Sequence, residues 1–278
     1  MPDSPPQTIV TLDEYRRLVE ELKQRLTGDV RAAAMAREIE QVLRFELEQR
    51  IPDEDRFAAY LSTPPPQRAR RTALVSDIHG HHAGLLAVLD DIKRQNCDRI
   101  ICLGDLVEGG PENEEVIETL QRHGVPCLRG NHDENNDVTL SKPARHFLTS
   151  LPERLVESDT LYVHISPRPI NRKINHEVEA WNVFDETHYR LIFVGHVHIP
   201  YIFGKRSTSY GEATRHSFEY NRPFDLSMED SYIVSVGSVG YGRDKVGKIR
   251  YAIYDCEANT VELRTVDGPV LPLDYAFG

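Results

Sequence analysis

The chain has 278 residues, of which 40% are hydrophobic, and a formal net charge of −11 at pH 7, which is enough material for one large domain or for a domain with an appendage. The negative charge disfavours a duplex nucleic acid as a stable partner, and no apolar run approaches the roughly 20 residues that span a bilayer. Because the four cysteines form no CxxC pair and residues 1–7 carry no basic-then-apolar signal pattern, we expect a cytoplasmic protein without a disulfide scaffold.

Residues 1–66 are predicted to form a helical extension. A capping box begins at Thr11, and apolar residues at helical spacing follow it until Gly28. A second periodic segment, residues 35–47, ends before a proline at position 52. We expect this helical hairpin to pack on the core or to form a homodimer contact, with a lid or a docking element as the alternative.

A proline run, Pro64-Pro65-Pro66, separates the extension from a main domain over residues 72–278. In this domain short apolar runs alternate with helical segments, which is typical of an α/β or layered α+β fold. A hairpin is predicted at its end, turning at Glu257-Ala258-Asn259 between residues 249–254 and 260–265. The other predicted strands are residues 73–75, 99–103, 125–129, 161–164, 191–194 and 232–236, and the predicted helices are residues 83–94, 113–123 and 177–189.

Acidic, amide and imidazole side chains gather at the ends of the predicted strands, at turns that contain glycine. The clusters are Ser76-Asp77-Ile78-His79-Gly80, Gly104-Asp105-Leu106-Val107-Glu108, Gly130-Asn131-His132-Asp133 and Gly195-His196-Val197-His198, together with His164. Because strand ends converge at one rim of a layered sheet protein, these five clusters are expected to meet in space. The i, i+2 spacing of Asp77/His79 and of His196/His198 predicts that both side chains of a pair leave an extended backbone on the same side.

Carboxylate oxygen, amide oxygen and imidazole nitrogen form the mixed ligand set that suits manganese, iron, zinc and similar divalent ions. The absence of thiolates at these positions argues against a structural zinc site. Each cluster alone is compatible with an ordinary turn or with surface histidines, so the hypothesis depends on all five together. The remaining histidines are interpreted as structural or surface residues: His81, His82, His123, His146, His176, His188 and His216.

These five blocks, in this order, resemble the calcineurin-like metallophosphoesterase superfamily. The stretch from Ile100 to Asp133, with Ile-Ile-Cys-Leu-Gly-Asp-Leu-Val, a Gly-Pro turn and Val-Pro-Cys-Leu-Arg-Gly-Asn-His-Asp, is most similar to its compact prokaryotic phosphodiesterase-like branch. The segment from Gly237-Ser238-Val239-Gly240 to Arg243 is similar to that branch as well. The resemblance covers residues 72 to about 256 and implies a four-layer α/β/β/α sandwich.

The resemblance also implies two divalent ions, manganese in first place and iron, zinc, nickel or cobalt as alternatives. The implied ligands are Asp77, His79 and His198 for one ion, Asn131, His164 and His196 for the other, and Asp105 as the bridge between them. His132 is then free of metal and acts near the scissile ester, with Glu108 as its carboxylate partner, and Asn131 and His132 contact the substrate phosphate. A water that bridges the ions would be the nucleophile, and His132 the proton donor to the leaving group.

The expected activity is hydrolysis of a phosphodiester or of a small phosphorylated compound, which would be the main partner of the protein. The alternatives are a phosphomonoesterase acting on phosphoprotein or nucleotide, dinucleoside polyphosphates included, and a non-catalytic protein-binding scaffold. Three positions depart from the family pattern: Ile165 stands where glycine commonly follows His164, Glu108 replaces the more usual aspartate of protein phosphatases, and Gly109 stands where those enzymes carry arginine. The missing arginine disfavours a phosphoprotein substrate.

Overall fold

The computed structural model describes residues 69–168, 173–245, 247–269 and 271. The predicted helical extension, residues 1–66, and its boundary at the proline run lie outside the described residues. Within the described part of the chain, no helix is long and apolar enough to cross a membrane.

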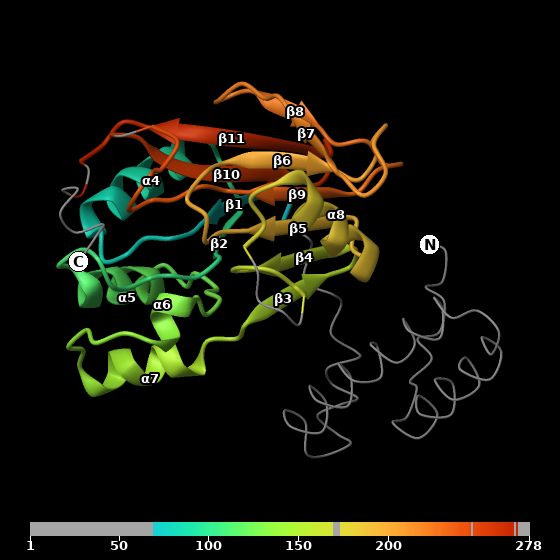
Figure 1. Cartoon of the computed structure of the whole chain (residues 1–278). Coiled ribbons are helices and arrows are strands. Elements are labelled where there is room, and N and C mark those ends of the chain that lie inside the picture. The colour runs from blue at the N-terminus through green and yellow to red at the C-terminus, as the bar shows by residue number, and fades with distance from the viewer. Residues whose placement is uncertain (1–68, 169–172, 246, 270, 272–278) are drawn as a thin grey trace, which may run out of the picture. The chain divides into compact units, whose positions relative to one another are not determined.

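Two β-sheets form the centre of the fold (Figure 1). Sheet A has the strand order β2-β1-β10-β11-β8, with β1 (Arg71–Val75), β2 (Arg99–Cys102), β8 (Pro223–Asp225), β10 (Ile249–Asp255) and β11 (Thr260–Val266). Sheet B has the order β3-β4-β5-β9-β6-β7, with β3 (Arg154–Glu157), β4 (Thr160–Val163), β5 (Leu191–Val194), β6 (Tyr201–Gly204), β7 (Thr214–His216) and β9 (Tyr232–Ser235). In sheet A β1 pairs in parallel with β2, and in sheet B β4, β5 and β9 run parallel to one another.

Helices cover the outer face of each sheet. Next to sheet A are α4 (His82–Arg94), α5 (Asn113–Arg122), the single turn α6 (Asn131–Glu134) and α7 (Lys142–Ser150), and next to sheet B is α8 (Glu177–Glu186). Val88 of α4 and Leu120 of α5 are buried in one cluster with Tyr251 of β10. Phe184 of α8 is buried in another cluster with Ile192 of β5.

The inner faces of the two sheets pack against each other and form the middle of the core. Leu74 and Tyr254 of sheet A share a buried cluster with Phe193 and Val234 of sheet B. The strand β5 is buried along its whole length because sheet B is covered on both faces, which explains its uniformly apolar sequence Leu-Ile-Phe-Val. The layers are therefore α/β/β/α, and the predicted four-layer sandwich is confirmed.

The predicted hairpin is present as β10 and β11. Asp255 accepts hydrogen bonds from the backbone N–H groups of Glu257 and Ala258, at 3.1 and 2.9 Å, and Asn259 takes the left-handed conformation with φ +53°. Asparagine tolerates this conformation better than most residues do, so the turn forms where its sequence predicts it.

The strand predicted at residues 125–129 is wrong. Only an isolated parallel bridge joins Cys127 to Cys102, the last residue of β2. Cys102 N–H donates to Pro126 O at 2.9 Å and Leu128 N–H donates to Cys102 O at 2.8 Å. Pro126 has no N–H to donate in return, so the ladder does not extend.

Candidate metal centre

Six of the seven side chains predicted to bind metal follow the ends of four strands, two from each sheet, and the seventh, Asn131, begins the short helix α6. Asp77 and Asp105 come two and three residues after β1 and β2, which are neighbours in sheet A. His164 directly follows β4, and His196 comes two residues after β5, the neighbour of β4 in sheet B. Parallel neighbours end at the same edge of a sheet, and this brings residues far apart in the sequence to one place.

The turns that carry these side chains have an unusual backbone conformation. The ligand candidates Asp77, His79, Asp105, His196 and His198 have φ values of 54°, 53°, 55°, 67° and 61°, and Glu108 has a φ of 70°. The prediction that each i, i+2 pair leaves an extended backbone is therefore wrong. Left-handed residues other than glycine cost of order 1–3 kcal/mol each and concentrate at functional sites, where the surrounding structure holds them.

Hydrogen bonds between neighbouring turns hold this conformation in place. Asp77 N–H donates to Gly104 O at 2.9 Å, and His79 N–H donates to Asp105 O at 3.0 Å. The turn after β1 is thus fixed on the turn after β2, and the Asp77 and Asp105 carboxylates are positioned together.

Glycine at position 130 permits a close approach in the centre. A Cβ atom on Gly130 would lie 2.1 Å from Asp105 Oδ1 and 2.4 Å from Asp105 N, distances that no real Cβ contact shows. Only glycine therefore allows the start of α6, which carries Asn131 and His132, to lie against the Asp105 carboxylate.

The first ligand group consists of Asp77, His79, Asp105 and His198. Their ligand atoms all lie within 4.8 Å of one another, and all four residues are buried. His79 Nε2 is 3.3 Å from His198 Nε2, and His198 Nε2 is 3.1 Å from Asp77 Oδ1. The two carboxylates and two imidazoles of this group thus surround a space about the size of a single ion.

The second ligand group consists of Asp105, His164 and His196, again with ligand atoms within 4.8 Å of one another. Asn131 Oδ1 adjoins this group, at 3.2 Å from His164 Nε2 and 2.9 Å from His196 Nδ1. Asp105 belongs to both groups. The structure thereby brings together all seven residues predicted to bind metal, divided between two groups that share one carboxylate.

The outer ring nitrogens of three histidines are held by backbone carbonyl groups. His79 Nδ1 lies 2.7 Å from Glu108 O, His164 Nδ1 lies 2.9 Å from Leu103 O, and His198 Nδ1 lies 2.9 Å from the carbonyl oxygen of Tyr241. A carbonyl oxygen can only accept, so Nδ1 carries the proton and, in a neutral ring, Nε2 presents a lone pair inward.

The donor atoms face one another in a way that fits divalent cations. The lone pairs of His79 and His198 point together across 3.3 Å, where they repel unless a cation lies between them. Asp105 Oδ2 is buried and makes no well-aligned hydrogen bond, although His164 Nε2 lies 3.0 Å away. An unsatisfied buried carboxylate oxygen requires a partner, and a metal ion supplies one.

Burial and neighbouring charges shift the pKa values of the ligand histidines. Burial lowers the pKa of His79 to about 4 against the opposing effect of Asp105, and burial with the nearby His164 lowers that of His196 to about 4. These rings are neutral at pH 7, as metal ligands must be. Burial also lowers the pKa of His164, but the Asp105 and Asp77 carboxylates outweigh it and raise the pKa to about 9, so metal binding would displace a proton there.

His132 and Glu108 lie beside the ligand groups without joining either one. His132 Nδ1 is 2.7 Å from Glu108 Oε2, and the two side chains are 40% and 41% exposed, in contrast to the buried ligands. His132 N–H donates to Asp105 Oδ1 at 2.9 Å, and the His132 ring centroid is 5.0 Å from that of His79. The predicted catalytic pair therefore adjoins the centre and is open to solvent.

Sequence reasoning assigned no role to Asp133, which supports the centre from behind. Its two carboxylate oxygens accept from the backbone N–H groups of Asp105, Leu106 and Gly130, each at 2.8 Å. Burial and the Asp105 charge raise the pKa of Asp133 to about 6. A sequence signal for this supporting role was available, because Asp133 directly follows His132 in the cluster Gly130-Asn131-His132-Asp133.

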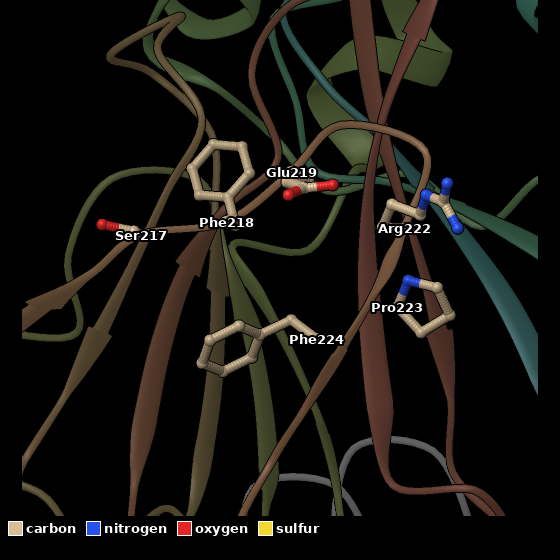
Figure 2. A pocket seen from close by; sticks show the side chains of 6 residues that line it. All are labelled: Ser217, Phe218, Glu219, Arg222, Pro223 and Phe224. Carbon is tan, nitrogen blue, oxygen red and sulfur yellow. The ribbon is translucent and has the colours of Figure 1, made fainter.

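A separate pocket of about 450 Å³ opens on the segment between β7 and β8 (Figure 2). It is lined by Ser217, Phe218, Glu219, Arg222, Pro223 and Phe224, none of which is a ligand candidate. The space therefore belongs to a different part of the surface from the two ligand groups.

Comparison with known protein families gives a match over most of the chain. The calcineurin-like phosphoesterase superfamily domain matches residues 71–259. An uncharacterized protein of Methanocaldococcus jannaschii is 29% identical over 226 residues, which cover 70% of this chain and 86% of that protein. A symmetrical bis(5'-nucleosyl)-tetraphosphatase of Pseudomonas putida is 36% identical over 95 residues, but these cover only 32% of this chain and 29% of that enzyme.

Two solved structures share the architecture. A metallophosphoesterase from Sphaerobacter thermophilus is 29% identical, with a TM-score of 0.65 over 73% of this chain and 90% of that chain. A hypothetical protein from Pyrococcus horikoshii has a TM-score of 0.53 over 72% of this chain and 88% of that chain, and its 18% identity supports the fold alone.

Proposed function

Because the chain belongs to the calcineurin-like phosphoesterase superfamily and is a phosphoester hydrolase, we propose that it uses two divalent ions to hydrolyse phosphodiesters or small phosphorylated compounds. The observation that carries the proposal is the position of Asp105, whose carboxylate belongs to both ligand groups while its Oδ1 accepts a hydrogen bond from His132 N–H.

The ligands of each ion follow from the two groups. One ion would be held by Asp77, His79, Asp105 and His198, and the other by Asp105, Asn131, His164 and His196. When bound, such a pair polarises phosphoryl oxygens and lowers the pKa of a bound water. The oxygen and nitrogen donors suit manganese first and iron, zinc, nickel or cobalt as alternatives.

Charge at the centre supports an anionic substrate in spite of the acidic chain. The carboxylates of Asp77 and Asp105 bring two negative charges to the ligand groups, so two divalent cations would leave a local charge of about +2. A phosphate ester is then attracted locally, although the chain carries a net charge of −11.

His132 is proposed to protonate the leaving oxygen. Its Nδ1 is bound to Glu108 Oε2 at 2.7 Å, which leaves Nε2–H of the protonated ring as the donor. The Glu108 carboxylate orients the ring and stabilises its positive charge. Asn131 Oδ1 adjoins the histidine ligands, so its amide N–H₂ is free to turn to a phosphoryl oxygen.

Nucleoside polyphosphates are a second substrate class. The similarity to the symmetrical bis(5'-nucleosyl)-tetraphosphatase of Pseudomonas putida favours them, over the 95 residues that match. A phosphoprotein substrate has less support, because Gly109 replaces the arginine expected at that position in protein phosphatases.

Metal analysis together with Asp105→Asn tests the proposal. We expect about two manganese ions per chain after dialysis. For Asp105→Asn we expect a loss of bound metal and at least a 100-fold fall in turnover, because a loss of several kcal/mol of transition-state stabilisation lowers the rate by about that factor. Asp185→Asn, at an exposed position on α8, is the control. Full activity in Asp105→Asn, or in the metal-free protein, would overturn the two-ion proposal.

Turnover of bis(p-nitrophenyl) phosphate, p-nitrophenyl phosphate and diadenosine tetraphosphate would then rank the substrate classes.

A further inference from the structure

The loop after β9 is anchored on two ligand-bearing turns. Gly240 N–H donates to Asp77 O at 2.9 Å, and Arg243 N–H donates to His198 O at 3.2 Å. The residues between these two anchors therefore lie against the first ligand group.

Tyr241 lies between the anchors and contacts the two histidines of that group. Its carbonyl oxygen accepts from His198 Nδ1 at 2.9 Å, and its own N–H donates to Ser238 Oγ at 2.8 Å. Its ring centroid is 5.5 Å from the ring of His79 and 6.4 Å from the ring of His198, to which it is nearly parallel at 15°. Tyr241 therefore packs against both imidazoles whose Nε2 atoms face each other.

The space for the Tyr241 ring depends on the missing side chain at position 109. Gly109 has a φ of +124°, and a Cβ atom there would lie 2.7 Å from Tyr241 Oη and 2.8 Å from Tyr241 Cε2. A larger residue would push the ring away. Gly109 directly follows Glu108, whose carbonyl oxygen accepts a hydrogen bond from His79 Nδ1. The Tyr241 ring therefore lies between Gly109 and the two histidines of the first ligand group.

We propose that Tyr241 is a positioning residue of the metal centre, that it holds the His79 and His198 rings in their ligand orientation, and that glycine at position 109 is required for this. The inference rests on the proposed two-ion function and names residues that bind no metal themselves. Hydrogen-bonded partners behind metal ligands affect metal affinity by about 10- to 100-fold because they fix ring orientation before the ion binds, and we expect packing by the Tyr241 ring to act in the same way.

Manganese affinity of the full chain, measured by titration calorimetry, tests the role of the ring. For Tyr241→Ala we expect the Kd of one of the two ions to rise about 10- to 100-fold, with a changed absorption spectrum of the cobalt-loaded protein. Tyr241→Phe keeps the ring and is expected to bind as the unmodified chain does. Tyr241→Leu fills similar space without a ring and should resemble Tyr241→Ala, which separates ring packing from simple loss of volume. Tyr210→Ala, at a 97% exposed position, is the control.

The outcomes separate this inference from the function on which it rests. If the unmodified chain binds no manganese, the two-ion function fails. If it binds two ions and Tyr241→Ala and Tyr241→Leu bind them equally well, only the positioning role of Tyr241 is overturned. A Tyr241→Phe variant as weak as Tyr241→Ala would also overturn it, because the ring would then not be the cause.

A double-mutant cycle tests the link to position 109. Gly109→Ala is expected to weaken manganese binding in the unmodified chain and to weaken it by a clearly smaller factor in the Tyr241→Ala background. Backbone strain at φ +124° is the same in both backgrounds and cancels in the comparison. Equal factors in the two backgrounds would overturn the coupling between Gly109 and Tyr241.

Discussion

Glu108 Oε2 accepts a hydrogen bond from His132 Nδ1 at 2.7 Å, and this contact determines which ring nitrogen of His132 is left for the substrate. Glu108 has a φ of 70°, and its backbone N–H donates to Asn113 Oδ1 at 2.9 Å. The carboxylate is therefore held by a strained turn that α5 supports. The His132 ring stands beside Asp105 without joining either ligand group, and its backbone N–H donates to Asp105 Oδ1.

Glu108→Gln is expected to lower kcat/KM about 10- to 100-fold and to leave manganese content unchanged. Glutamine can still accept the hydrogen bond, but it lacks the negative charge that stabilises a protonated His132. Steady-state kinetics with parallel metal analysis measures both quantities. Glu115→Gln, at an exposed position of α5, is the matched control. Loss of metal from Glu108→Gln would contradict the assignment of Glu108 outside the ligand groups.

His132→Ala is expected to discriminate between leaving groups. With a diester that releases an alkyl alcohol, the rate should fall about 10²- to 10⁴-fold, because that alcohol needs a proton to depart. With bis(p-nitrophenyl) phosphate the fall should be much smaller, because p-nitrophenolate leaves readily without one. Equal losses for both substrates would exclude general acid catalysis by His132. His146→Ala, at an exposed position on α7, should change neither rate.

Gly130→Ala is expected to damage the centre and the fold together. Its methyl group would collide with Asp105 Oδ1 and N, so either α6 or the Asp105 carboxylate must move. We expect a loss of about 1–3 kcal/mol in unfolding free energy, as for other overpacked sites, together with weaker manganese binding. Urea unfolding and metal titration give the two values. Gly124→Ala, whose added Cβ meets nothing within 4 Å, should retain full manganese affinity.

Asp91 gives a pH-dependent contribution to stability. Burial raises its pKa, but hydrogen bonds from Tyr251 Oη at 2.7 Å and Arg264 Nε at 2.9 Å outweigh this and hold it below the usual value of 3.8. The folded state thus binds its proton less tightly than the unfolded state does. The stabilisation is complete above the unfolded pKa and is lost as the pH falls through the folded one.

Asp91→Asn should therefore lower the unfolding free energy by about 1.5–3 kcal/mol near pH 7, the value of a hydrogen bond to a charged group. The difference from the unmodified chain should shrink below about pH 4. Urea unfolding between pH 3 and pH 7, without metal, measures it. A difference that stays constant down to pH 3 would show that the Asp91 charge contributes nothing. Asp90→Asn, one residue away and exposed, is the control.

The sequence allowed the candidate ligands to be placed together because it gives their side-chain types and their positions directly after apolar runs. Asp77, Asp105 and His164 follow short buried strands, and the ends of neighbouring parallel strands lie at the same edge of a sheet whatever the sequence of the loops between them. The backbone at these positions was not predictable from spacing. Asp77 and His79 reach the same space through left-handed turns, which depend on hydrogen bonds to the turn at Asp105, far away in the sequence.

The elements that sequence reasoning missed are short or half exposed. The strands β7 and β8 have three residues each, β6 is fully buried but has only four, and β3 alternates between exposed and half-buried positions, so none has a periodicity that stands out. The turn α6 has only four residues. For α7 a signal was available, since Ser141 caps the helix by accepting from Ala144 N–H and a proline occupies its first turn.

Both ligand groups draw their members from both sheets. Asp77, His79 and Asp105 extend from sheet A, whereas His164, His196 and His198 extend from sheet B. An ion in either group would therefore be a cross-link between two layers whose inner faces pack through an apolar cluster. Loading the centre would then raise the melting temperature in proportion to the logarithm of free metal concentration.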